Sequence, residues 1–141
     1  MKTILIALVA SIGLMVKTTT PILTGTDNYN YTSNELKFQL TIPMELKPKL
    51  IIEETENSVV FKYENPNYQA DVYLFSINKV SENVWLQVKQ NVNEGRILAN
   101  TNGYIIYSEI TRETTLRGKN KVEFEQMLSQ VKELVNTFKK L

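Results

Sequence analysis

The feature that most constrains the fold is an apolar stripe near the C-terminal end. Large apolar side chains recur there at steps of three and four residues, at Phe124, Met127, Leu128, Val131, Leu134, Val135 and Phe138. This period predicts a helix over residues 120–141 with one continuous apolar face. At roughly 1.5 to 3 kcal/mol per buried large side chain, the stripe would contribute on the order of 10 kcal/mol before the loss of conformational entropy. The helix therefore needs a second layer to cover it. A coiled coil is the weaker alternative, because the stripe lasts only about three heptads.

Both ends of this helix carry further signals. Asn120 and Glu123 have the spacing of a capping box, which predicts a start at Asn120. Lys139 and Lys140 suit the negative end of the helix dipole. We therefore expect the helix to run nearly to the last residue.

The middle of the chain alternates between apolar and polar residues, which is the period of β-strands. In FQLTI, residues 38–42, every second side chain is apolar, and Pro43 ends the run. Residues 50–64 predict two further strands joined by a short polar turn. The segment ADVYLFSI, residues 70–77, is apolar on both faces, as is typical of a central strand in a covered sheet.

A shorter helix and a hairpin follow the central strand. Ser81 is placed to cap a helix that starts at Glu82 and ends at Gly95. Trp85 lies on the apolar face of this helix, which predicts that it belongs to the core. The Asn-Gly pair in TNG, residues 101–103, then predicts a hairpin.

These elements predict the α+β class: an antiparallel β-sheet flanked by helices, in a single domain. Strands and helices do not alternate throughout the sequence, and it has no Gly-rich loop. Both observations disfavour a parallel nucleotide-binding sheet.

The composition limits the chemistry that the chain can perform. Its 141 residues, 43% hydrophobic and 22% charged, are about the size and make-up of one globular domain. It has no cysteine and no histidine. Disulfides, thiol nucleophiles, conventional Ser/His/Asp triads and zinc sites of the usual ligand types are therefore excluded. We expect no enzyme activity, no cofactor and no metal.

The charge balance argues against a nucleic-acid partner. The formal net charge is +1, and loss of Lys2 and Lys17 with the front of the chain would bring it to about −1. Proteins that bind nucleic acids usually carry a basic excess or a basic stripe, because phosphate neutralisation supplies most of their affinity. We therefore expect no nucleic-acid partner.

The front of the chain predicts export. Residues 4–16 follow Lys2 and are apolar apart from Ser11 and Gly13. A run of this length is typical of a signal peptide, whereas a bilayer-spanning helix needs about twenty apolar residues. Because no clean Ala-x-Ala cleavage site follows, a permanent anchor over residues 4–23 is the alternative. Both hypotheses put the body of the protein outside the cytoplasm, either secreted or anchored to the outer face of the cytoplasmic membrane.

Five segments carry a family resemblance: YTSNELKFQLTIP, IIEETENSVVFKYE, LFSINKVSENVW, GYIIY and VEFEQMLSQVKELVNTFK. They resemble small exported proteins of Gram-positive bacteria, chiefly Bacillus- and Clostridium-like ones, related to the PsbP/Mog1-like fold. The resemblance runs from Tyr31 to Leu141. One departure from the family pattern is Lys37, where members often have glycine.

The resemblance implies an α/β/α sandwich around an antiparallel sheet and an extracytoplasmic location. It brings no catalytic residues, since the better-known cousins act as non-enzymatic subunits or binding partners. We expect residues 1–25 to be a signal peptide or N-terminal membrane anchor, residues 26–34 a spacer, and residues 35–141 the PsbP/Mog1-like domain. The expected function is non-enzymatic binding of a protein or cell-envelope component.

The alternative function is a carboxylate-dependent hydrolase of cell wall or polysaccharide, and three nearby acids are the candidates for it. Glu53, Glu54 and Glu56 could bind a cation or supply a pair of carboxylates. On a strand, however, Glu53 points away from Glu54 and Glu56. A solvated sheet edge therefore explains the trio better, and the hydrolase would need two buried acids that face one cleft.

Three tyrosines are the candidate partner-binding residues: Tyr63, Tyr68 and Tyr73, around the segment ENPNY. Tyrosine offers rigid apolar area with a polar tip and is enriched in contact surfaces. The alternative is that these side chains cover the edge of a sheet.

Overall fold

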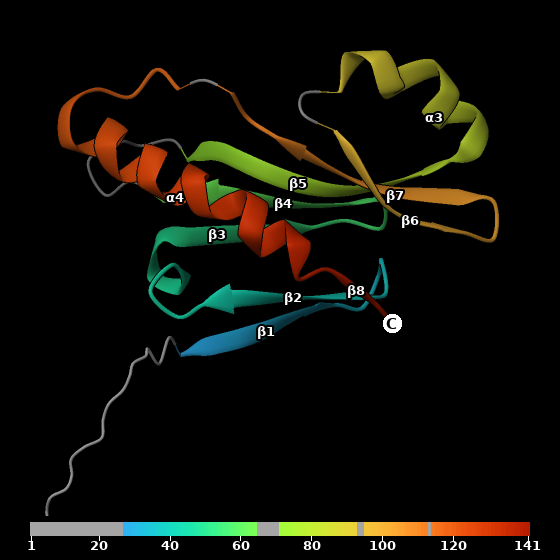
Figure 1. The fold of residues 1–141 in the computed structure, drawn as a ribbon, viewed down its shortest axis with the longest axis horizontal. Coiled ribbons are helices and arrows are strands. Elements are labelled where there is room, and N and C mark those ends of the chain that lie inside the picture. The colour runs from blue at the N-terminus through green and yellow to red at the C-terminus, as the bar shows by residue number, and fades with distance from the viewer. Residues whose placement is uncertain (1–26, 65–70, 93–94, 113) are drawn as a thin grey trace, which may run out of the picture.

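Two antiparallel sheets and two α-helices make up the described part of the chain (Figure 1). The computed structural model describes residues 27–64, 71–92, 95–112 and 114–141. The predicted signal peptide or anchor and Tyr68 lie outside these ranges. Within them, no helix is both long enough and apolar enough to span a bilayer.

The smaller sheet joins the two ends of the domain. Its order is β1 (Asn28–Ser33), β2 (Phe38–Pro43) and β8 (Lys139–Lys140). β1 therefore occupies part of the segment predicted to be a spacer. β8 pairs Lys140 with Phe38, so Lys139 and Lys140 lie in a strand rather than at a helix end, contrary to prediction.

The larger sheet has five strands in the order β3-β4-β5-β7-β6. Their bounds are β3 Leu50–Glu54, β4 Ser58–Tyr63, β5 Val72–Ser81, β6 Arg96–Thr101 and β7 Tyr104–Ile110. The structure confirms the strands predicted in this region and the central place of β5. It also confirms the hairpin between β6 and β7, whose turn residues Asn102 and Gly103 have φ of 53° and 79°. Two successive left-handed residues are what a type I′ turn requires.

The long C-terminal helix is α4, Gly118–Asn136, and its apolar stripe is confirmed. Five of the predicted residues are buried: Phe124, Met127, Val131, Leu134 and Val135. Both predicted ends differ from the structure. The helix begins at Gly118, two residues before Asn120. The predicted capping box does not form, because the Glu123 side chain accepts a hydrogen bond from Tyr63 instead. Beyond its end, Phe138 stacks on Phe38 of β2 with 5.3 Å between ring centroids.

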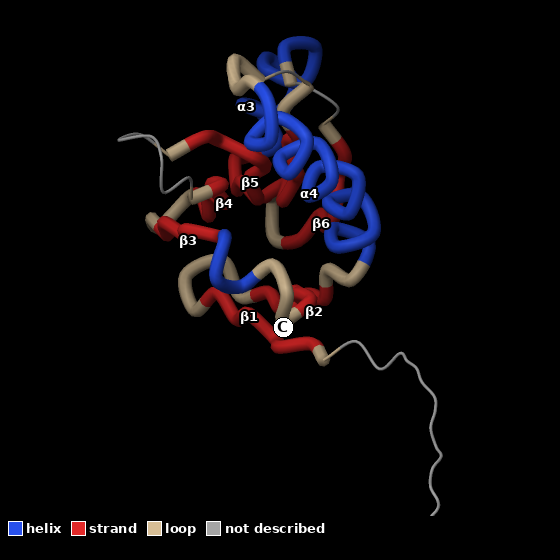
Figure 2. Tube along the Cα trace, turned by 90° about the vertical axis from the view of Figure 1, so that its left-hand side faces the viewer, coloured by secondary structure: helices blue, strands red, loops and turns tan. Residues whose placement is uncertain are grey.

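The core lies between α4 and one face of the larger sheet, and β2 closes it. Figures 1 and 2 show α4 along one side of that sheet and the β1–β2 hairpin beyond the edge strand β3. Val59, Phe61 and Tyr63 alternate along β4 and are fully buried. Phe61 stacks on Phe75 of β5 with 4.2 Å between ring centroids. The apolar side chains of the strands thus pack in one core with the apolar stripe of α4, as the sequence pattern predicts.

The short helix α3 spans Glu82–Val88 and lies at the far end of the larger sheet. The Ser81 cap is confirmed, since its Oγ accepts a hydrogen bond from the backbone N–H of Val84 at 3.3 Å. A 3-10 turn, η2 (Lys89–Asn91), follows, so the helix ends well before Gly95. None of its residues is buried. The prediction that Trp85 belongs to the core is therefore wrong: it is half-buried, because two helical turns at the sheet end cannot enclose an indole.

Candidate binding surfaces

The structure describes two of the three tyrosines predicted to bind a partner, Tyr63 and Tyr73. Tyr63 is fully buried and packs edge-on against Phe124 of α4, with ring centroids 5.9 Å apart. It has no exposed area for a partner to contact. Tyr73 is half-buried, and its hydroxyl donates to the backbone carbonyl of Glu109 at 3.0 Å. The role of Tyr68 stays a prediction.

The hydroxyl of Tyr63 belongs to a hydrogen-bonded cluster with Glu123 and Lys49. It donates to Glu123 Oε1 at 2.6 Å, and the ammonium of Lys49, at the end of the 3-10 turn η1 (Lys47–Lys49), lies 2.7 Å from Glu123 Oε2. The hydrogen bonds from Lys49 and Tyr63 lower the pKa of the Glu123 carboxyl. Burial, and then the bond to Glu123, raises the pKa of Tyr63 to about 12. The cluster therefore links η1, β4 and α4 and holds Glu123 ionised, whereas a general acid needs a raised pKa.

The acidic trio is a solvated edge, as the strand alternation predicts. Glu53 pairs with Lys62 on β4 at 2.8 Å. Glu54 accepts hydrogen bonds from the hydroxyls of Tyr31 and Ser33, which tie β3 to β1. None of the carboxylates in the described ranges is buried, and none of these residues forms a group that could hold a metal ion. The described residues thus provide no buried acid pair of the kind that the hydrolase alternative requires.

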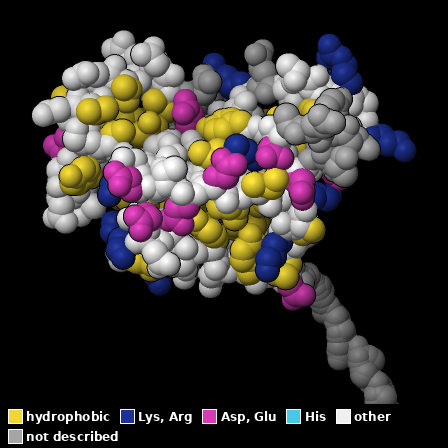
Figure 3. Space-filling view, turned by 180° about the vertical axis from the view of Figure 1, so that it is seen from behind, with side chains coloured by type: hydrophobic (Ala, Val, Ile, Leu, Met, Phe, Trp, Pro, Cys, Tyr) yellow, Lys and Arg dark blue, Asp and Glu magenta, His cyan; other side chains and the backbone are white. Residues whose placement is uncertain are grey.

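The end of the molecule that holds α3 exposes large apolar side chains. Leu86 is 62% exposed and Val84 41%, both on α3, and Ile97 of β6 is 48% exposed. Ile97 lies opposite Tyr107 of β7, on which Trp85 packs with ring centroids 4.8 Å apart. Seen from behind, hydrophobic side chains gather over this end (upper left in Figure 3). We name Val84, Trp85, Leu86, Ile97 and Tyr107 the α3 surface.

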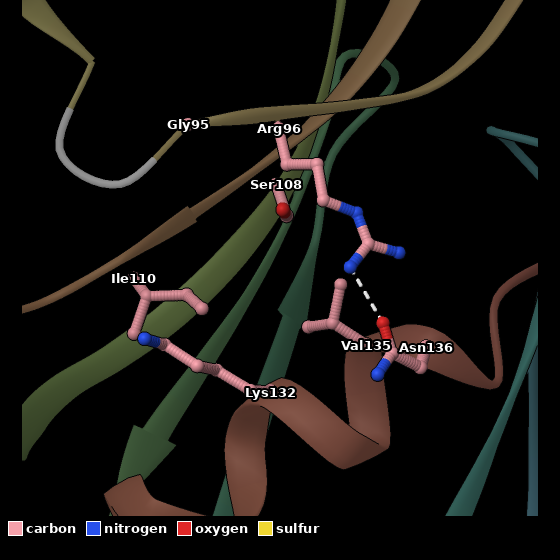
Figure 4. A pocket seen from close by; sticks show the side chains of 7 residues that line it. All are labelled: Gly95, Arg96, Ser108, Ile110, Lys132, Val135 and Asn136. Carbon is pink, nitrogen blue, oxygen red and sulfur yellow. Dashed lines mark hydrogen bonds between the residues drawn. The ribbon is translucent and has the colours of Figure 1, made fainter.

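A pocket of about 500 Å³ opens between the β6–β7 strands and the last turn of α4 (Figure 4). Seven residues line it: Gly95, Arg96, Ser108, Ile110, Lys132, Val135 and Asn136. Arg96 extends from β6 across the pocket and donates to the side-chain oxygen of Asn136 at 2.5 Å. The buried side chains of Ile110 and Val135 give it an apolar floor. We name this site the seam pocket.

Neither surface was predicted from the sequence. Arg96, Ser108 and Asn136 come from three elements, and Arg96 and Asn136 are 40 residues apart in the chain. Only the pairing of β6 with β7 and the packing of α4 bring them together. The α3 surface had a usable signal, because Val84, Trp85, Leu86 and Val88 cannot all lie on one face of a short helix.

Comparisons of the chain with protein-family models, with curated proteins and with solved structures found no match.

Proposed function

We propose that this protein is a non-enzymatic, extracytoplasmic binding domain that docks a protein or cell-envelope component through the α3 surface. The observation that carries the proposal is the exposure of apolar side chains on α3. Four of the seven residues of α3 are large and apolar, and such side chains on a helix normally face a core. None of the residues of α3 is buried, so a partner would remove Leu86 and Val84 from water.

Burial of these side chains would stabilise a complex. Transfer of a large apolar side chain out of water contributes roughly 1.5 to 3 kcal/mol, and aromatic residues are enriched at contact surfaces. Trp85 and Tyr107 already form a packed aromatic pair beneath the exposed side chains. A partner that presents an apolar groove would meet a preformed surface and would order few side chains on binding.

The relation to the PsbP/Mog1-like group and the α/β/α sandwich are part of this proposal. Ile106 and Tyr107 are successive strand residues and point to opposite faces of the sheet. Ile106 joins the core that α4 covers, and Tyr107 contacts Trp85 of α3. Two helices on opposite faces of one antiparallel sheet support such a layered arrangement, and the export-like front of the chain supports a location outside the cytoplasm.

The test is a pulldown from the native cell envelope in gentle detergent with matched variants. Leu86→Glu puts a charge on the α3 surface, and Val122→Glu puts the same charge on an exposed apolar position of α4. We expect a stoichiometric partner with the wild type and with Val122→Glu, and its loss with Leu86→Glu. Equal recovery with both variants would reject the α3 surface as the docking site. Tyr68→Ala in the same series tests the remaining predicted tyrosine.

A further inference from the structure

The seam pocket contains an arginine, Arg96, that forms no ion pair with a described acid. Arg96 and Lys132 both line it, from β6 and α4, and none of the seven lining residues is acidic. Among described residues, Arg96 forms no ion pair, and its side chain is held by the neutral amide of Asn136. A guanidinium has five N–H donors in a planar fork, so the bond to Asn136 orients the group and leaves donors for a ligand.

The other lining residues narrow the chemistry of that ligand. Ser108 is 1% exposed, and its hydroxyl lies on the sheet side of the pocket, where it can donate to a bound oxygen (Figure 4). Ile110 and Val135 offer no polar atom and would contact a hydrocarbon group. The volume of about 500 Å³ lies within the range of small-molecule sites.

We propose that the seam pocket binds an organic carboxylate that bears a short apolar group. The carboxylate pairs with the fork of Arg96, and the apolar group lies on Ile110 and Val135. Carboxylate is favoured over inorganic phosphate because a planar, singly charged group matches one oriented guanidinium, and because the floor is apolar. Such a group can belong to a free fatty acid or to the last residue of a peptide.

The experiment is titration of the purified protein by calorimetry and by amide chemical-shift mapping. The probes are hexanoate and N-acetyl-leucine, each paired with its uncharged amide, hexanamide and N-acetyl-leucinamide. We expect the acids to bind at least about tenfold more tightly than the amides and to shift the amide signals of residues lining the pocket. Preference for hexanoate would identify a free acid as the source, and preference for N-acetyl-leucine a peptide terminus.

Two substitutions separate this proposal from general attraction to a protein surface. Arg96→Ala removes the fork, and Asn136→Asp places an internal carboxylate where the amide now accepts from Arg96. Both should weaken binding at least about tenfold, whereas Arg117→Ala, an exposed arginine at the start of α4, should leave it unchanged. Equal affinity for acid and amide, equal loss in all three variants, or shifts confined to other residues would overturn the proposal. Because no envelope partner enters the titration, its result is independent of the α3 surface.

Discussion

Lys37 adopts a backbone conformation that suits glycine better than lysine. Its φ is 58°, in the tight turn between β1 and β2, and its carbonyl accepts a hydrogen bond from the backbone N–H of Leu141 at 2.9 Å. The left-handed conformation costs a residue with a Cβ roughly 1 to 2 kcal/mol, and a glycine at position 37 would avoid this cost. Part of the benefit is offset, because glycine loses more conformational entropy on folding than lysine does.

We therefore expect Lys37→Gly to raise the free energy of unfolding by about 0.5 to 1 kcal/mol. Chemical denaturation followed by circular dichroism measures the change. Lys119→Gly is the matched control, because it puts the same glycine into the right-handed backbone of α4 and should destabilise by up to about 1 kcal/mol. A loss of stability in both variants would contradict the strain at Lys37.

The cluster of Lys49, Tyr63 and Glu123 predicts a pH dependence of stability. The pKa of Glu123 in the folded state lies below its ordinary value of 4.5, so the cluster stabilises the fold when the carboxyl is ionised. This contribution is present above pH 4.5 and is lost as the pH falls through the lowered pKa. Glu123→Gln should lower the melting temperature near pH 7 and should reduce its fall towards pH 3, as measured by thermal unfolding across pH. Parallel profiles for the two proteins would contradict this role.

At alkaline pH the stability of the fold should decrease as the pH rises, because of Tyr63. The pKa of Tyr63 is raised from 10.0 to about 12, so the folded state holds its proton where the unfolded chain has lost it. Stability should therefore fall between about pH 10 and pH 12 in the wild type. Tyr63→Phe keeps the ring and removes this part of the fall, and Tyr104→Phe, at an exposed tyrosine, serves as its control.

At the scale of elements, the sequence was sufficient wherever a periodic pattern faced the core. The strands from Phe38 to Ile110 and the stripe of α4 follow directly from alternation and helical spacing. β1 was missed because NYNYTS is mostly polar, and its inward residues Tyr29 and Tyr31 are only partly buried. The start of α4 was misplaced because Glu123 serves the cluster with Tyr63 rather than a cap. The seam pocket depends on tertiary packing, which no local pattern encodes, whereas the exposure of apolar side chains on α3 could have been inferred from their spacing.

The β6–β7 turn gives a prediction about a single element. Gly103 has φ of 79°, and a Cβ added there would meet no atom within 4 Å. The cost of Gly103→Ala is therefore conformational alone, and we expect a loss of about 1 to 2 kcal/mol in the free energy of unfolding. Urea denaturation measures it. A neutral result would mean that the hairpin can adopt another turn type.

The stripe of α4 gives a second prediction of this kind. Phe124 is fully buried against Tyr63, whereas Val122, two residues earlier, is exposed. Phe124→Ala should cost about 3 to 5 kcal/mol through lost transfer energy and the cavity left behind. Val122→Ala should change stability by less than about 0.5 kcal/mol. Similar losses for both would contradict the assignment of the buried face.

For the whole molecule, the proposed export predicts the mass of the mature protein. Since β1 begins at Asn28 and pairs along its whole length with β2, a cleaved leader must end before that residue to leave the smaller sheet intact. We expect intact-mass measurement of protein from the native host to show loss of about the first 25 residues, the usual length of a signal peptide. Full-length protein in the membrane fraction would instead indicate a permanent anchor.

The pairing of β8 with β2 has a consequence for the order in which the chain can fold. Lys139 and Lys140 reach the edge of β2 only about 100 residues after Phe38 has left the ribosome, and α4 arrives almost as late. One edge of the N-terminal hairpin therefore stays unpaired until residues 139–140 have been synthesised. Late completion of the smaller sheet is compatible with the export proposed above, since a chain crosses a secretion channel before it has folded.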